Sequence, residues 1–195
     1  MSNKLHIAFD SSKLLYQHSH GTHVKDQLIF HETISHDEKG LADILGVENY
    51  LAQKDFGIHG MVDAEGNIAW AKGLGDAIFW QCGGDNTRSI GIELVSNIPS
   101  AYRTNLARRN HWKERTTQLN AAAKLAACIH RAHPNIVMVY TKGIKAGITS
   151  HWNISQIFPA SEGHTDCWPV NEGGYFPLLR LIGQTRLYYK EGWKF

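Results

Sequence analysis

The segment that most constrains the fold of this chain is a short apolar run, Leu28–Phe30, which ends in His31. Apolar runs of this length between polar residues are typical of strands buried on both faces. Such strands lie in sheets that helices cover from both sides. The segment therefore predicts an α/β fold with a histidine at the end of a central strand. A histidine there can bind a metal ion, or it can hydrogen-bond a nearby carbonyl.

A second strand, Ser89–Val95, is the clearest in the sequence because its apolar residues surround a single charged residue, Glu93. A carboxylate inside so apolar a strand needs a partner or a function. Gly57–Asp63 and Ile68–Trp70 predict a hairpin. The turn between them, Ala64–Asn67, has glycine at the position that requires a positive φ.

Two helices are predicted from apolar residues at helical spacing. One covers Leu41–Lys54, and the other runs from an N-cap at Thr116 to about His133. A third, short helix is expected over Phe176–Ile182, whereas residues 96–114 are polar and predict irregular structure. We therefore expect a central mixed β-sheet flanked by helices, with a metal cleft at the strand ends.

The composition indicates one globular domain with a sizeable core, since 43% of the 195 residues are hydrophobic and 19% are charged. The formal net charge of +2 is too small to indicate nucleic-acid binding. Three cysteines without a close-spaced pair fit a reducing cytoplasm. The N-terminus lacks the apolar core of a secretory signal, and no segment has the length of a membrane helix. We expect a cytoplasmically made monomer with neither nucleic acid nor membrane as a partner.

Residues that can bind zinc recur late in the sequence. Gly147–His151 is a second strand-like segment that ends in histidine, and Asp166 and Cys167 follow in a loop. With His31 they make a set of two histidines and one carboxylate or thiolate. Three protein ligands leave a fourth position open to water, which is the pattern of catalytic zinc sites.

Glu93 and His164 can complete such a site. Zinc lowers the pKa of a water molecule, and Glu93 can take the proton of that water and give it to a leaving amine. His164 can donate a hydrogen bond to the developing oxyanion. By spacing alone, structural roles explain His151 and Glu93 equally well, since no HExxH or CxxC motif is present.

Five blocks occur in a characteristic order: the strand that ends in His31, then Gly57–Ile68, Asn86–Val95, Ser150–His151 and Gly163–Cys167. In this order they resemble the type 2 N-acetylmuramoyl-L-alanine amidase family, which includes bacterial and phage peptidoglycan amidases and animal peptidoglycan recognition proteins. Asn86–Val95 is the most specific block. The resemblance covers about residues 26–182. It implies one catalytic domain, residues 1–195, with a polar N-terminal extension and an aromatic, basic C-terminal tail.

The resemblance implies that His31 and His151 are zinc ligands. The family's third ligand lies in a Thr-x-Cys-Pro or a Lys-Thr-Asp-Pro type of motif, and this chain departs from both. Aligned on Lys-Thr-Asp, the third ligand is Asp166; aligned on Thr-x-Cys, it is Cys167. We prefer Asp166, because that alignment leaves a proton donor, His164, two residues ahead of it.

The resemblance also implies a catalytic base. In family members without the catalytic tyrosine, the glutamate of the Ile-Gly-Ile-Glu strand is the base; here that residue is Glu93, and Ile58 takes the place of the tyrosine. Trp80 and Asn86 are expected to line the groove for glycan and peptide, although Trp80 is equally explained as a residue packed on the rim of the sheet. Arg88 either binds a peptide carboxylate or caps its strand.

The function implied is hydrolysis of the amide between the lactyl group of N-acetylmuramic acid and the L-alanine of the stem peptide in bacterial peptidoglycan. The closest kind of member is a phage endolysin, made in the host cytoplasm without a signal peptide and released to the wall by a holin-type route. Two alternatives stay open. One is a peptidoglycan-binding recognition domain without catalysis, and the other is a cytoplasmic amidase that recycles soluble muropeptides.

Overall fold

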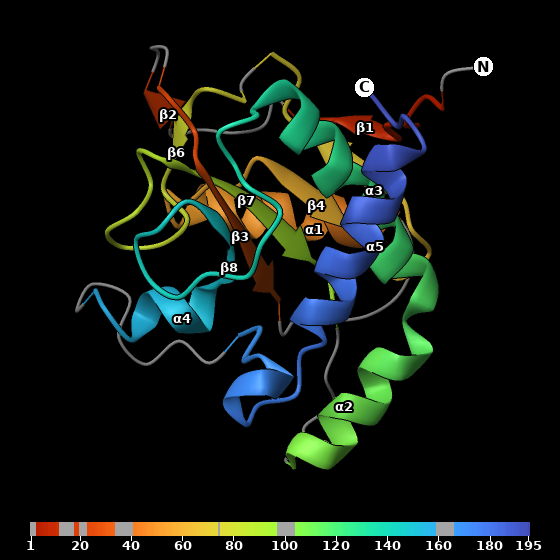
Figure 1. The fold of residues 1–195 in the computed structure, drawn as a ribbon. Helices are drawn as coiled ribbons and strands as arrows, with labels where there is room; N and C mark the ends of the chain where they lie inside the picture. Colours follow the sequence, from red (N-terminus) through yellow and green to blue (C-terminus); the bar gives the residue numbers. More distant parts are fainter. Residues whose placement is uncertain are drawn as a thin grey trace.

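The computed structural model describes residues 3–11, 18–19, 23–33, 41–73, 75–96, 104–158 and 166–195. They form a six-stranded sheet and a two-stranded sheet with helices packed around them (Figure 1). Across the larger sheet the strands are β1 (Phe9–Asp10), β5 (Ile68–Trp70), β4 (Gly60–Val62), β7 (Ser89–Leu94), β3 (Gln27–Glu32) and β8 (Gly147–Ser150). The smaller sheet pairs β2 (His18–Ser19) with β6 (Ile78–Phe79). The helices are α1 (Leu41–Gln53), α2 (Asn105–Glu114), α3 (Thr116–Ala132), α4 (His151–Ser155) and α5 (Leu178–Lys190), with a 3₁₀ turn at Val170–Glu172.

The larger sheet is mixed, as the sequence predicted. Strand β3 lies next to the edge strand β8 and pairs in parallel with both β7 and β8, while β7 pairs in parallel with β4. The predicted hairpin is present: β5 returns antiparallel to β4 through a turn in which Gly66 has a φ of 84°. Because β3, β7 and β8 run the same way, their carboxyl ends meet at one edge of the sheet.

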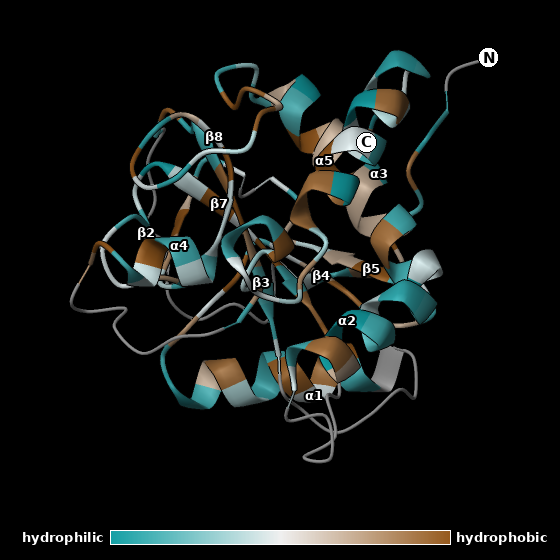
Figure 2. Ribbon diagram, turned by 60° about the horizontal axis from the view of Figure 1, so that its bottom comes forward, coloured by the Kyte–Doolittle hydropathy of each residue, from teal (hydrophilic) through white to brown (hydrophobic). Residues whose placement is uncertain are grey.

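Side chains of the central strands alternate between two faces. Leu28 and Phe30 of β3 join Ile92 of β7 in a buried cluster that α3 and α5 complete. On the other face, Met61 of β4 packs against Ile44 of α1 in a second cluster. Figure 2 shows α1 on one side of the sheet and α3 with α5 on the other. The predicted α/β architecture with helices on both faces is therefore confirmed.

The expectation of irregular structure over residues 96–114 was wrong, because α2 occupies 105–114. Its N-cap is Thr104, whose hydroxyl accepts a hydrogen bond from the amide of Ala107. Few apolar residues mark this helix in the sequence, and within it only His111 and Trp112 are buried. Trp112 anchors the helix, since its ring meets that of Phe176 edge to face at a centroid distance of 5.1 Å.

Two helix boundaries also differ from the expectation. Thr116 is the first residue of α3 rather than its cap, because α2 ends at Glu114 and leaves only Arg115 between the two helices. Helix α5 begins at Leu178 and continues to Lys190, well beyond the predicted end, since Thr185 still faces the core. None of the described helices is both long and apolar enough to cross a membrane.

Candidate metal centre

The register of β3 and β8 brings two histidines to the same edge of the sheet. Phe30 pairs with Ser150, so His31, the next residue of β3, lies beside His151, which follows β8 and opens α4. The Nδ1 atoms of the two rings are 3.2 Å apart, and the ring centroids are 4.6 Å apart. Both side chains are buried. The pairing of β3 with β8 therefore holds the Nδ1 atoms of His31 and His151 close together.

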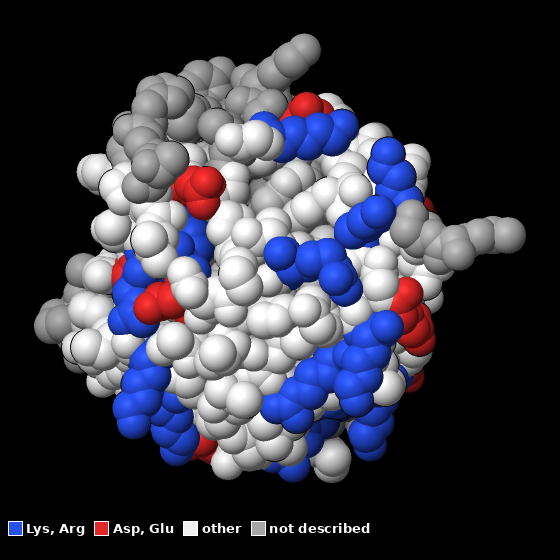
Figure 3. All heavy atoms as spheres, turned by 45° about the horizontal axis from the view of Figure 1, so that its top comes forward, with Lys and Arg blue, Asp and Glu red and all other residues white. Residues whose placement is uncertain are grey.

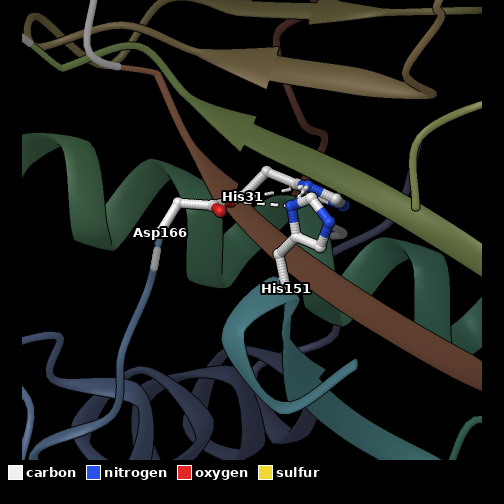
Figure 4. A group of neighbouring side chains, drawn as sticks. All are labelled: His31, His151 and Asp166. Carbon is white, nitrogen blue, oxygen red and sulfur yellow. Dashed lines mark hydrogen bonds and ion pairs between the residues drawn. The ribbon is translucent and has the colours of Figure 1, made fainter. Parts of the chain in front are cut away.

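Asp166 supplies a third donor atom from the loop before α5 (Figure 4). Its Oδ2 lies 3.0 Å from Nδ1 of His151 and 3.7 Å from Nδ1 of His31. Its carbonyl accepts a hydrogen bond of 3.1 Å from the backbone amide of Trp152, which ties the loop to the first turn of α4. Two imidazoles and a carboxylate therefore converge from three separate segments.

The three donor atoms, Nδ1 of His31, Nδ1 of His151 and Oδ2 of Asp166, form a triangle whose dimensions fit a zinc ion. Nitrogen and oxygen ligands about 2.0–2.1 Å from a tetrahedral zinc lie about 3.3 Å from one another. The three donor separations here, 3.0, 3.2 and 3.7 Å, bracket that value. Within the described ranges, His31, His151 and Asp166 are the group that gathers in this way, with ligand atoms inside 4.8 Å of one another. A fourth ligand position is left to water or substrate, as in catalytic zinc sites.

Cys167, the alternative third ligand, lies next to Asp166 in sequence but outside this triangle. Its side chain is fully buried in the cluster that contains Phe30 and Phe176. Burial raises the pKa of its thiol well above the usual range, which disfavours the thiolate that zinc requires. The chain turns at Cys167, which has a φ of 55°, so the side chains of Asp166 and Cys167 point in different directions. The geometry supports Asp166 as the third donor.

Glu93 lies next to the histidines because it pairs with His31 across β3 and β7. Directly paired residues point to the same face of a sheet, so the carboxyl of Glu93 and the ring of His31 are neighbours. Only 8% of Glu93 is exposed. Burial raises the pKa of its carboxyl well above the usual value, and the charges of Asp166 and Glu32 raise it further. A bound cation would offset this effect and favour the carboxylate.

The structure does not bring the predicted substrate residues Asn86 and Arg88 to the triangle. They lie before the start of β7, whereas Glu93 is near its end, roughly 16 Å further along the strand. The side-chain oxygen of Asn86 accepts hydrogen bonds from the amides of Gln81 and Cys82. Trp80 precedes the loop of residues 81–88 and is 55% exposed. Substrate binding by these three residues stays a prediction.

Arg88 has structural partners of its own. Its Nε and Nη2 donate to the carboxylate of Asp26 at 2.7 and 2.5 Å, and its Nη1 donates to the carbonyl of Ile144. It therefore joins the starts of β3 and β7 to the loop before β8. His164, predicted to donate to the oxyanion, lies outside the described residues.

Several residues beside the triangle were missed in the sequence. The indole rings of Trp152 and Trp168 stack at a centroid distance of 5.5 Å and an interplanar angle of 15°. Trp152 follows His151 directly, and Trp168 is two residues after Asp166. Their closeness in sequence to the candidate ligands could have indicated that they lie near the site. Glu32, next to His31, was also missed because a single carboxylate at a strand end resembles a solvent-exposed residue.

Solved structures with the same fold include peptidoglycan hydrolases and recognition proteins. The hydrolase AmiA of Staphylococcus aureus has a TM-score of 0.61 at 16% identity, covering 98% of this chain and 86% of that chain. The N-acetylmuramoyl-L-alanine amidase LysC of Clostridium intestinale has a TM-score of 0.55 at 12% identity, with coverages of 95% and 97%. The recognition protein PGRP-SA of Apis mellifera has a TM-score of 0.52 at 17% identity, with coverages of 75% and 84%. At these identities the likeness establishes the fold.

The fold is thus that of the peptidoglycan amidases and peptidoglycan recognition proteins. The family model described as N-acetylmuramoyl-L-alanine amidase matches residues 21–169 of the sequence. The chain therefore belongs to the N-acetylmuramoyl-L-alanine amidase family, and the resemblance seen in its sequence blocks is confirmed. Among curated proteins, no significant match is found.

Proposed function

We propose that this protein is a zinc-dependent N-acetylmuramoyl-L-alanine amidase that lyses bacterial cell walls. The observation that carries the proposal is the triangle of His31, His151 and Asp166, with Glu93 directly beside it. A recognition domain without catalysis, the alternative function, does not require such a convergence of two imidazoles and a carboxylate.

In the proposed mechanism His31, His151 and Asp166 would hold a zinc ion. Zinc bound there would polarise the scissile carbonyl and lower the pKa of a water molecule. Glu93 takes a proton from the water that attacks the carbonyl, and passes the proton to the amine of L-alanine as the amide bond breaks. Burial around Glu93 favours this proton transfer, because it excludes solvent that would compete as a proton acceptor.

His164 remains the proposed donor to the oxyanion, a role that rests on its position two residues before Asp166. Trp80, Asn86 and Arg88 remain proposed substrate contacts. We further propose that the chain acts as a single catalytic domain and as a monomer. An endolysin role, with synthesis in the host cytoplasm and holin-type release, is supported by solved endolysins of the same fold, among them Ph2119 from a Thermus scotoductus bacteriophage.

The test compares two substrates, purified sacculi and soluble muropeptides, and measures newly freed amino groups of L-alanine by mass spectrometry. An endolysin is expected to release them from sacculi and to reduce the turbidity of the suspension. Release from soluble fragments alone would instead indicate a recycling amidase. Binding to sacculi without release of alanine amino groups would contradict the enzymatic proposal and leave a recognition domain.

A further inference from the structure

Glu32 occupies an unusual position at the end of the buried strand β3. It is the last residue of β3 and follows His31, so the two side chains point to opposite faces of the sheet. Only 5% of Glu32 is exposed. A carboxyl buried this deeply has a high desolvation cost, and a hydrophobic side chain of similar size would fill the same space without it. Its retention is best explained by the hydrogen bonds that it accepts.

Hydroxyl groups from two segments donate to this one carboxyl. The hydroxyl of Tyr175, in the loop before α5, donates to Oε2 at 2.9 Å. The hydroxyl of Ser96, just after β7, donates to Oε1 at 3.2 Å. The backbone amide of Tyr175 in turn donates to the carbonyl of Trp168, the residue after Cys167, at 2.8 Å. Glu32 therefore joins β3, the end of β7 and the loop that carries Asp166.

The link from Glu32 through Tyr175 to Trp168 matters most for the candidate metal centre, because Trp168 directly follows the Asp166–Cys167 turn. Cys167 has a φ of 55°, a left-handed conformation that costs on the order of 1 kcal/mol for a residue with a Cβ atom. The hydrogen bonds of Tyr175 to Glu32 and to the Trp168 carbonyl hold the chain just after this turn. On the other side of the turn, the carbonyl of Asp166 accepts from the amide of Trp152. The turn is therefore held at two points, from β3 through Tyr175 and from α4 directly.

We propose that Glu32 is a positioning residue for the metal centre: by fixing the Asp166–Cys167 turn to the strand that carries His31, it sets the distance between the carboxylate of Asp166 and the two imidazoles. The inference rests on the proposed zinc site and assigns a role to a residue that does not touch the ion itself. Removal of such outer partners typically weakens metal binding by about 10–100-fold.

The test measures zinc affinity of the full chain by competition with a chromophoric chelator, alongside the visible spectrum of the Co²⁺ form. Glu32→Met, which removes both acceptor contacts, is expected to weaken zinc binding about 10–100-fold and to change the Co²⁺ spectrum. Glu32→Gln keeps an acceptor for the Tyr175 hydroxyl and is expected to recover most of the affinity. The matched control is Glu48→Met, since Glu48 is equally buried and lies on α1, which gives no residue to the triangle.

The melting temperature of the metal-free protein separates positioning from folding. Glu32→Met is expected to leave it unchanged or raise it, because the substitution removes a buried acid beside two others, while zinc affinity falls. Equal loss of zinc affinity in Glu32→Met and Glu48→Met would overturn the inference. If Glu32→Met does not fold, Tyr175→Phe is expected to weaken zinc binding by about threefold, and wild-type affinity there would overturn it.

The outcome for the wild-type chain distinguishes the two proposals. Zinc binding and wall lysis by the wild type, with full zinc affinity in Glu32→Met, would refute the role of Glu32 alone. A wild-type chain that fails to bind zinc would refute the metal centre and the positioning role together.

Discussion

The two ends of the parallel strands β3 and β7 carry charged residues in opposite arrangements. At their starts, opposite charges pair within the protein: Arg88 donates twice to Asp26, and the buried Lys25 donates to the carbonyls of Asn86 and Thr87. Each donor at this end has an acceptor on the neighbouring segment. These contacts hold the strands in register.

At the other end, like charges gather instead. Glu93 and Asp166 lie beside two histidines, Glu32 lies on the opposite face of the same strand end, and the charges of Asp166 and Glu32 add to burial in raising the pKa of Glu93. Burial likewise raises the pKa of Glu32 to about 7. Asp166 lies beside the two histidines, and the charge of Arg108 lowers the pKa of Glu32, but burial has the larger effect on that carboxyl. Paired charges thus mark the end that stabilises the fold, and buried acids with raised pKa values mark the end where a bound cation would favour their charged form. On the face that Figure 3 shows, Lys and Arg side chains are spread in several places, with fewer Asp and Glu side chains among them.

The largest effect is expected from Asp166→Ala. Removal of the third donor should abolish stoichiometric zinc binding and lower wall lysis by more than about 1000-fold. The melting temperature of the metal-free protein should not fall, because one of several like charges has been removed. Zinc content by atomic absorption, turbidity assays and calorimetry check the three statements. Lytic activity retained by this variant would point to Cys167 as the ligand.

Glu93→Gln should lower kcat by about 10²–10⁴-fold while zinc stays bound. The base must be a carboxylate, so activity of the wild type should be lost as the pH falls through the pKa of Glu93. The variant should lack this acid limb of the pH profile. Steady-state rates on sacculi, measured over a range of pH with zinc in slight excess, provide the check. A variant that lyses walls at the wild-type rate would rule out Glu93 as the base.

At the paired end, Lys25→Met should change the pH dependence of stability. Burial lowers the pKa of Lys25 to about 8 from 10.5. Between pH 8 and pH 10.5 the unfolded chain therefore binds more protons than the folded one, and the free energy of unfolding rises with pH. The wild type should gain up to about 3 kcal/mol more than the variant over this window. Urea titrations of both proteins at several pH values measure the difference; parallel pH curves would contradict it.

Arg88→Ala should have the smallest effect, a loss of about 1–2 kcal/mol in the free energy of unfolding at pH 7, because the pair with Asp26 is partly exposed to solvent. Zinc affinity should stay at the wild-type value, since Arg88 lies at the opposite strand end. Thermal unfolding and chelator competition test both points. A large rise in KM, with normal stability, would instead assign the guanidinium to substrate.

Much of the sheet could be predicted because its strands carry strong local signals. Leu28–Phe30 and Ser89–Val95 are apolar enough to be recognised as buried strands, and the Gly66 turn marks the hairpin. Helix α2 could not be recognised, because its stability comes from Thr104 as a cap and from one buried tryptophan rather than from an apolar stripe. The predicted C-terminal helix was too short, because the residues around Thr185 are mostly polar and give no sign that Thr185 is buried in the core.

The candidate site was only partly predictable. His31 and His151 could be foreseen because each ends a strand-like segment, and parallel strands bring such ends together. The choice between Asp166 and Cys167 depends on a left-handed turn between neighbouring residues, which hydrophobic pattern and spacing do not encode. The role of Glu32 depends on donors from residues more than 60 positions away, Ser96 and Tyr175, so no local pattern reveals it.

The most direct test of the account is a zinc titration of chelator-treated protein, with release of L-alanine amino groups from sacculi as the readout. We predict negligible release without metal, and a rise that reaches its maximum at one zinc ion per chain. Asp166→Ala should show no recovery over the same range. Full activity in the metal-free protein, or products that carry new reducing sugar ends instead of alanine amino groups, would contradict the account.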